Sequence, residues 1–156
     1  MAKVGDGIQT GLSWIPDSNG HVPGNGIVVG SGVYIARMHE SGGLIPGKVV
    51  PQYKKAYCSN DEREYEHQKY EVLCDTSAPG TSKCYRWLAA SDGNVPDNAV
   101  VGGVSKDGDA LYVARSEIFG VPVAGKVDDD HTSASFPYGG KEHAVKHYDV
   151  LVWCMK

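Results

Sequence analysis

Most of this 156-residue chain occurs twice, and this internal repeat restricts the possible folds more than any other feature. Copy one begins at Trp14 and copy two at Trp87, and identical residues follow at identical spacings. Before a short insertion in copy two, near residues 105–109, the matches are Ser18, Gly20, Val22, Pro23, Asn25, Val28 and Gly30 with Ser91, Gly93, Val95, Pro96, Asn98, Val101 and Gly103. After it they include Tyr34, Ala36, Arg37, Gly47, Lys48, Glu64 and Tyr70 with Tyr112, Ala114, Arg115, Gly125, Lys126, Glu142 and Tyr148.

So many ordered identities predict two copies of one structural unit. We expect a single domain over residues 1–156, with repeat one at 14–74, a linker at 75–86 and repeat two at 87–154. The linker is rich in Ser, Thr, Gly and Pro. Two copies are too few for a solenoid or propeller, so we expect a pseudo-two-fold pair packed face to face.

Each copy consists of short β-branched and aromatic runs separated by Gly and Pro, which predicts strands. The chain has 20 Gly and 8 Pro, and this frequency of turn residues favours short strands over long helices. Residues 61–69 contain good helix formers, but the equivalent segment contains Gly139 and Gly140, so we expect strand or loop in both. The predicted fold is all-β, with tandem pseudo-symmetric repeats of short antiparallel strands. The expected strands are 27–29, 33–37, 48–50, 70–73, 99–101, 111–115 and 148–153.

Charge and composition argue against several classes of function. The net charge is −4 and no Lys/Arg cluster stands out, so we expect no nucleic-acid partner. No run approaches the roughly 20 apolar residues of a membrane span, and residues 1–11 lack the apolar core of a signal peptide. We therefore expect a cytoplasmic protein, or one exported without a leader. Cys58, Cys74, Cys84 and Cys154 show no Cys-x-x-Cys spacing, which predicts free thiols; a Cys74–Cys84 bridge is the alternative in an oxidising compartment.

Catalytic, metal and cofactor motifs are not found. The sequence contains neither Gly-x-Ser-x-Gly nor His-Glu-x-x-His, so we expect no enzyme and no catalytic residue. The glycines at 24–26 precede a predicted strand rather than a helix and indicate a turn. Residues 128–131, Asp-Asp-Asp-His, lack the spacing of a calcium loop and are expected to form a solvated turn. We expect no metal ligand and no cofactor.

The polar residues that occur in both copies are the candidates for binding. Lys48 and Lys126 each follow a glycine, and we expect them to lie exposed in turns. Glu64 and Glu142 precede the last strand of each copy, and a carboxylate with a Lys recognises the paired hydroxyls of a sugar. Arg37 and Arg115 are expected to form internal ion pairs that hold each repeat together. We expect Trp14 and Trp87 to be core anchors rather than sugar platforms.

At these positions the chain resembles the DM-nine repeat family. The similarity covers nearly the whole chain. Its elements in copy two are residues 93–100 (Gly-Asn-Val-Pro-Asp-Asn-Ala-Val), 110–115 (Ala-Leu-Tyr-Val-Ala-Arg), 125–126 (Gly-Lys), 138–143 (Tyr-Gly-Gly-Lys-Glu-His) and 148–151 (Tyr-Asp-Val-Leu). In copy one they are residues 22–25, 34–37, 44–48 and 70–73. The family includes invertebrate mannose-binding lectins linked to innate recognition of microbes, and the N-terminal part of natterin-like toxins. No pore-forming module follows, so the toxin function is not expected.

This resemblance implies an all-β tandem fold, frequent homodimers and metal-independent binding of mannose. It implies that Lys48 and Lys126 contact the sugar together with an acidic residue shortly after the glycine turn. In copy two the nearest positions are Ser105 and Asp107, so the acceptor there is Asp107 or Glu142. Copy one has the shorter segment Gly30-Ser31-Gly32, which supplies no carboxylate.

Three functions follow, in order of preference. The first is a lectin for mannose-type glycans with one or two shallow sites. The second is a protein-interaction scaffold that has lost its sugar site, which the missing carboxylate of copy one suggests. The third is a glycosidase, which needs two carboxylates roughly 5–10 Å apart. Glu64 and Glu142 are its only symmetric candidates.

Overall fold

Each half of the chain forms seven strands in the same order. The computed structural model describes residues 11–154, so the expectations about the extreme N-terminus lie outside the described residues. The first half contains β1 (Leu12–Ser18), β2 (Val28–Gly30), β3 (Val33–Glu40), β4 (Gly43–Val50), β5 (Lys55–Asn60), β6 (Arg63–His67) and β7 (Lys69–Asp75). The second contains β8 (Tyr85–Ser91), β9 (Val101–Val104), β10 (Ala110–Ile118), β11 (Val121–Val127), β12 (Ala134–Tyr138), β13 (Lys141–Val145) and β14 (His147–Trp153). The only helical element in the described part is η1 (Pro51–Tyr53), a single 3₁₀ turn, so the all-β prediction is confirmed.

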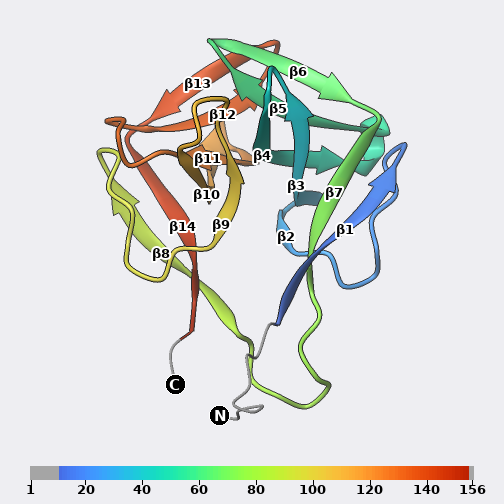
Figure 1. Ribbon diagram of the computed structural model, residues 1–156. Helices are drawn as coiled ribbons and strands as arrows, with labels where there is room; N and C mark the ends of the chain where they lie inside the picture. The colour runs from blue at the N-terminus through green and yellow to red at the C-terminus, as the bar shows by residue number, and fades with distance from the viewer. Residues whose placement is uncertain (1–10, 155–156) are drawn as a thin grey trace.

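The strands join into one sheet whose order reads the same from both ends. It runs β1-β7-β3-β4-β5-β6 through the first half and then β13-β12-β11-β10-β14-β8 through the second. The halves meet where β6 lies beside β13, at the top of Figure 1. There the amide of Glu64 donates to the carbonyl of Gly140, and the amide of Glu142 donates to that of Glu62. This mirrored order is compatible with the expected pseudo-two-fold pair.

The halves also share an apolar core. One buried cluster belongs mainly to the first half and a second to the second half. A third cluster combines Ile27, Ile35 and Leu73 with Val100, Val113, Ala124 and Leu151. Trp14 and Trp87 pack against it, as expected for core anchors. The halves therefore meet through this shared core, through the contact of β6 with β13 and through the pairing of β9 with β4.

Six of the seven predicted strands exist, the prediction at 99–101 overlaps β9 only at Val101, and the predicted set was incomplete. The N-terminal strands β1 and β8 were not predicted, although they pair with β7 and β14 along their whole length. Pro16 and Asp17 interrupt the apolar pattern of β1, and its partner strand comes from the far end of the repeat. Strands β5, β11 and β12 were also missed. Residues 63–67 and 141–145 form hairpin strands, in agreement with the choice of strand or loop.

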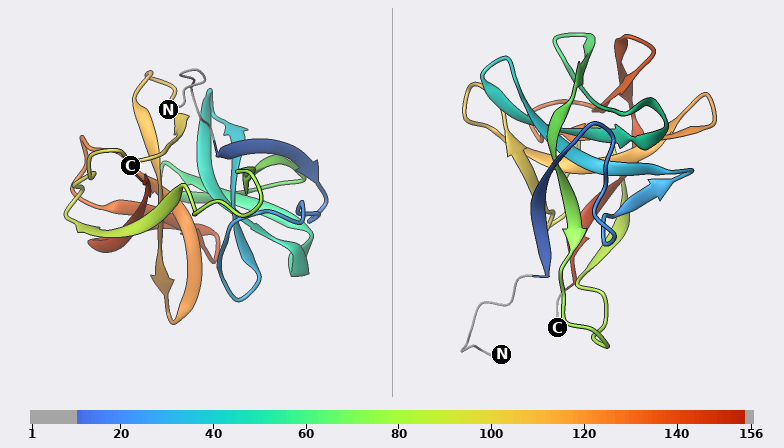
Figure 2. Two further views of the ribbon diagram at one scale, coloured as in Figure 1. Left: turned by 90° about the horizontal axis from the view of Figure 1, so that it is seen from below. Right: turned by 90° about the vertical axis from the view of Figure 1, so that its right-hand side faces the viewer.

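Both ends of the described chain and the linker gather on one side of the molecule, opposite the β6–β13 junction (Figures 1 and 2).

All four cysteines are free thiols, and Cys58 and Cys74 are buried, so no Cys74–Cys84 bridge is present. Within residues 11–154, no helix is long and apolar enough to cross a membrane.

Candidate functional site

The two Gly-Lys steps lie inside strands and not in exposed turns. Lys48 is in β4 and Lys126 is in β11, and their side chains are only 8% and 11% exposed. A Cβ on Gly47 would collide with the carbonyl of Tyr57, and one on Gly125 with that of Ser135. The expectation of exposed lysines was therefore wrong, because each glycine marks a close approach of neighbouring strands and not a turn.

Lys126 lies at the contact between β4–β6 of the first half and β11–β13 of the second, which we call the seam. Its side chain contacts mainly the opposite half. Its Nζ donates to the carbonyl of Ser59 at 2.5 Å and to Oδ1 of Asn60 at 3.5 Å. The carboxylate of Glu142 lies 3.3 Å away. Glu142 in turn accepts hydrogen bonds from Oγ of Ser59 at 2.9 Å and from the amide of Glu62 at 3.0 Å. The network holds the ammonium group at a defined position.

Lys48 occupies the equivalent position but is enclosed by aromatic rings. Its Nζ donates to the carbonyl of Pro137 at 2.8 Å and lies 3.9 Å from Glu64, which itself accepts from the amide of Gly140 at 2.8 Å. The rings of Tyr57 and Tyr138 lie 5.6 and 5.3 Å from Nζ. Burial lowers the pKa of Lys48, and the charge of Glu64 opposes this effect.

A cavity of about 210 Å³ adjoins Lys126. Its wall includes the predicted binding residues Ser105, Asp107 and Lys126. Glu142 contacts Lys126, whereas Lys48 and Glu64 belong to the other end of the seam. The remaining polar lining is Glu40, Ser41, Asn60, Asp61, Lys106, Asp109, Asp128, His131 and Ser135. The structure thus brings four of the six predicted residues together and separates two.

The loop of residues 105–109 forms part of this cavity. Oγ of Ser105 accepts hydrogen bonds from the amides of Asp107 and Asp109, at 3.3 and 3.1 Å, so it fixes the loop. The side chain of Asp107 is exposed. Asp128, expected in a solvated turn, is instead buried in the cavity wall, and its Oδ1 accepts from the amide of Asp130.

The corresponding region around Lys48 is lined by aromatic rings. Where the Lys126 cavity has Ser41, Asn60 and Ser135, the repeat alignment places Phe119, Tyr138 and Tyr57. Phe119 and Tyr138 pack edge to face with their centroids 5.9 Å apart. Bulky rings replace small polar groups, so the sequence repeat conceals an asymmetry between the two sites.

The cavity residues contributed by the other half were missed. Asn60, Asp61 and Glu40 differ from their counterparts Tyr138, Gly139 and Ile118. A search for residues repeated in both copies cannot select positions at which the copies differ. These residues reach Lys126 because β6 and β13 join the halves.

Arg37 and Arg115 form the expected internal ion pairs, although not at strand ends. Arg37 Nε lies 2.7 Å from Glu71, and Arg115 Nε lies 3.0 Å from Asp149. Each guanidinium also stacks on the tryptophan of its own repeat, 4.3 and 4.4 Å from the ring centroids. These contacts hold β1 to β3 and β8 to β10, so the arginines are structural.

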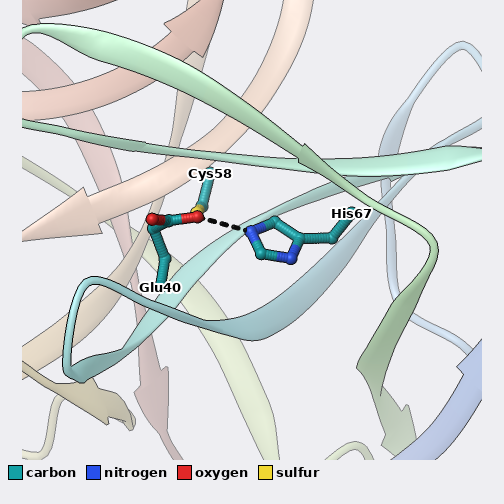
Figure 3. A group of neighbouring side chains, drawn as sticks. All are labelled: Glu40, Cys58 and His67. Carbon is teal, nitrogen blue, oxygen red and sulfur yellow. Dashed lines mark hydrogen bonds and ion pairs between the residues drawn. The ribbon is translucent and has the colours of Figure 1, made fainter.

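A second polar cluster was not anticipated by the sequence. Glu40, Cys58 and His67 converge inside the first half (Figure 3), and His67 Nε2 is 2.8 Å from Oε1 of Glu40. Burial and the nearby carboxylates raise the pKa of the Cys58 thiol to about 12. The three residues are far apart in the sequence and occur in one copy only, so no spacing marks them.

Comparison with known proteins gives three findings. A family model described as the DM9 repeat matches residues 29–145. The crystal structure of the nematode sperm cell motility protein MFP2B is similar, with a TM-score of 0.69 and 18% sequence identity. The alignment covers 96% of this chain and 48% of MFP2B, so the chain spans about half the length of that protein. At this identity the likeness concerns the fold alone. No curated protein matches the chain significantly.

Proposed function

Because the chain belongs to the DM9 repeat family, we propose that it is a lectin-like binding protein that holds a mannose-type glycan in the cavity beside Lys126. One observation carries this proposal. A small cavity, lined almost entirely by polar side chains, contains the lysine of the Gly-Lys step, held by Glu142, together with the carboxylate of Asp107. Family membership supports a binding protein of the lectin type, and the polar residues of the cavity support a ligand rich in hydroxyl groups.

The cavity suits a neutral ligand with several hydroxyl groups. Its volume, about 210 Å³, is below the roughly 300 Å³ at which pockets for drug-sized ligands begin, which suits a single sugar ring. Hydroxyl groups both donate and accept, so they can pair with carboxylates and with an ammonium group simultaneously. Lys126 can supply a donor if a sugar hydroxyl displaces its long 3.5 Å contact with Asn60, and Asp107 supplies an exposed acceptor. These side chains provide the hydrogen bonds without a metal ion.

We propose binding without hydrolysis. A glycosidase needs a free carboxylic acid and a second carboxylate at the sugar. Glu64 and Glu142 instead accept hydrogen bonds from backbone amides across the seam, from Gly140 and Glu62. Carboxylates that accept hydrogen bonds in this way are suited to holding the two halves together, and this supports binding without proton transfer to a sugar.

Among the described residues, the cavity beside Lys126 has no polar counterpart at Lys48, because aromatic residues line the equivalent region there. A single sugar site binds weakly, and a pair of sites on one particle gains affinity from effective concentration. We therefore propose a homodimer that engages repeated mannose units on microbial surfaces. Light scattering on the purified protein measures the dimer directly, and a monomer would remove this source of avidity.

A glycan array with and without chelator tests the sugar proposal. We expect a mannose signal that the chelator does not change. Lys126→Met and Asp107→Asn should abolish it, and Lys48→Met, the matched change in repeat one, should retain it. Circular dichroism establishes that each variant is folded. Glycan binding by folded Lys126→Met equal to that of the unmodified protein would overturn the site assignment.

A protein-interaction scaffold is the second candidate, and one observation favours it. Lys48, Lys126, Glu64 and Glu142 all have partners within the chain, so their repetition is explained by the seam alone. A blank array with a folded protein would support this candidate. Affinity capture with Asp107→Asn as a matched bait would then identify partners that need the cavity loop.

A further inference from the structure

Three side chains with metal-binding atoms meet in the first half of the molecule, outside the lysine network. Glu40 is the last residue of β3, Cys58 is in β5 and His67 is the last residue of β6. Their carboxylate oxygen, sulfur and imidazole nitrogen all lie within 4.8 Å of one another (Figure 3). They come from three strands, so the fold itself produces the convergence.

The three equivalent positions of the second half carry apolar residues. In the repeat alignment, Glu40, Cys58 and His67 correspond to Ile118, Phe136 and Val145. Those three residues pack together in the apolar core of the second half. The same backbone therefore accepts a fully apolar set, and packing alone does not require a carboxylate, a thiol and an imidazole. All three positions carry a possible metal ligand in one copy and none in the other.

The cluster is buried but can be reached from the cavity. Cys58 is fully buried, whereas the side chains of His67 and Glu40 are 23% and 18% exposed. Glu40 also forms part of the cavity wall. Its second oxygen, Oε2, accepts a hydrogen bond from Ser41 at 2.9 Å. That contact orients the carboxylate in the way that outer hydrogen bonds orient metal ligands.

We propose that Glu40, Cys58 and His67 bind a zinc ion. Sulfur, imidazole nitrogen and carboxylate oxygen are the ligands zinc takes, at about 2.3 Å for sulfur and 2.0–2.2 Å for nitrogen and oxygen. In a tetrahedral site these lengths separate the ligand atoms by about 3.3–3.6 Å. The 2.8 Å contact between His67 and Glu40 needs to open only slightly for the ion to replace the shared proton. A water molecule completes the tetrahedron.

Zinc binding at this site is accompanied by the release of protons from its ligands. The Cys58 thiol gives its proton to solvent and coordinates as thiolate, and His67 coordinates as neutral imidazole through Nε2. The carboxylate of Glu40 supplies a further negative charge. Two anionic ligands neutralise the dication, so the site holds no net charge in the interior.

Cobalt(II) is the probe for this site, because a thiolate ligand gives it a near-ultraviolet charge-transfer band. We expect one cobalt ion per chain, that band, and displacement by zinc. Glu40→Ile with His67→Val installs the residues of the second half and should preserve the fold while removing the band. His67→Gln should weaken binding at least about tenfold, since even outer-shell changes cost 10–100-fold.

Two control variants identify the ligands. Cys84→Ser with Cys154→Ser removes the two less buried thiols, and Asp129→Asn with Asp130→Asn removes the exposed carboxylates of the other acidic group. Both should keep the band and the affinity. Absence of a charge-transfer band, or a band that survives Glu40→Ile/His67→Val, overturns the proposal. The glycan array is a separate readout, so failure of either site leaves the other intact.

Discussion

At the scale of single residues, Lys48 and Lys126 show how equivalent positions acquire different surroundings. Both ammonium groups donate to a carbonyl of the opposite half, at 2.8 and 2.5 Å. One is covered by Tyr57 and Tyr138, and the other borders a polar cavity. Both lysines form contacts at the seam, whereas only Lys126 borders the cavity. Loss of seam contacts is therefore expected to reduce stability, and loss of cavity contacts to reduce binding.

Glu142 should matter more to stability than an exposed glutamate in an ion pair. Glu142→Ala removes the acceptor for Ser59 and Glu62 and leaves Lys126 without its carboxylate. Loss of one partner from a largely buried pair costs about 3 kcal/mol. Urea unfolding measures this, with Glu66→Ala as the control, because the pair of Glu66 with Lys55 is exposed and should matter little. Equal effects of the two substitutions would contradict the structural role of Glu142.

Two equivalent tyrosines, one in each repeat, predict that the stability of the fold decreases at alkaline pH. The hydroxyls of Tyr70 and Tyr148 donate to the carbonyls of His21 and Asn94, and burial raises the pKa of both. An acid with a raised folded pKa stabilises below its unfolded pKa of about 10, and that stability is lost as the pH rises further.

The double change Tyr70→Phe/Tyr148→Phe tests this prediction. At pH 7 it should cost about 1 kcal/mol per lost hydrogen bond. Above pH 10 the difference from the unmodified protein should shrink, because phenylalanine has no proton to lose. Denaturant titrations from pH 7 to 11 measure the difference, and a gap that stays constant would show that the two hydroxyls are not linked to folding.

At the scale of elements, the close approach of neighbouring strands determines the direction of the two lysine side chains. Gly47 in β4 lies against Tyr57 in β5, and Gly125 in β11 lies against Ser135 in β12, with no room for a Cβ. The strands can therefore approach closely beside each lysine, and the lysine side chain is directed to the seam. The glycine of the Gly-Lys step has a packing role that its sequence context does not reveal.

Gly125→Ala should separate β11 from β12 and move Lys126 away from Ser59. Overpacking of this kind costs about 1–3 kcal/mol, and we expect glycan binding to fall as well. Thermal unfolding and the glycan array measure the two effects. Gly24→Ala is the control, since a Cβ there meets no atom within 4 Å. If both variants are as stable as the unmodified protein, the close approach does not constrain the strands.

At the scale of the whole molecule, we expect the two halves to unfold as one cooperative unit. The shared core combines Ile27, Ile35 and Leu73 with residues of the second half, and β6 continues the sheet into β13. A separated half would expose this core and an open strand edge, both of which favour aggregation. Residues 77–82 of the linker belong neither to this core nor to the β6–β13 contact, so we expect the interface to matter more than the covalent connection.

A protease site inserted into residues 77–82 tests this unity. The cleaved protein should remain a complex on gel filtration and unfold in one transition. Each half expressed alone should lack the near-ultraviolet circular dichroism of fixed aromatic side chains. A half that folds cooperatively alone would show that the repeats are independent domains.

The sequence by itself determined the all-β class and the division into two matched copies, because strand patterns, turn residues and identical spacings are local properties. It also identified Lys126, Ser105, Asp107 and Glu142 as related. Only the tertiary structure decided that the lysines are buried and that a polar cavity adjoins Lys126 while aromatic rings surround Lys48. Those outcomes depend on residues such as Asn60 and Tyr138, which the β6–β13 junction carries across from the opposite half. Contacts between segments distant in the chain leave no local spacing, so they arise only when the halves join.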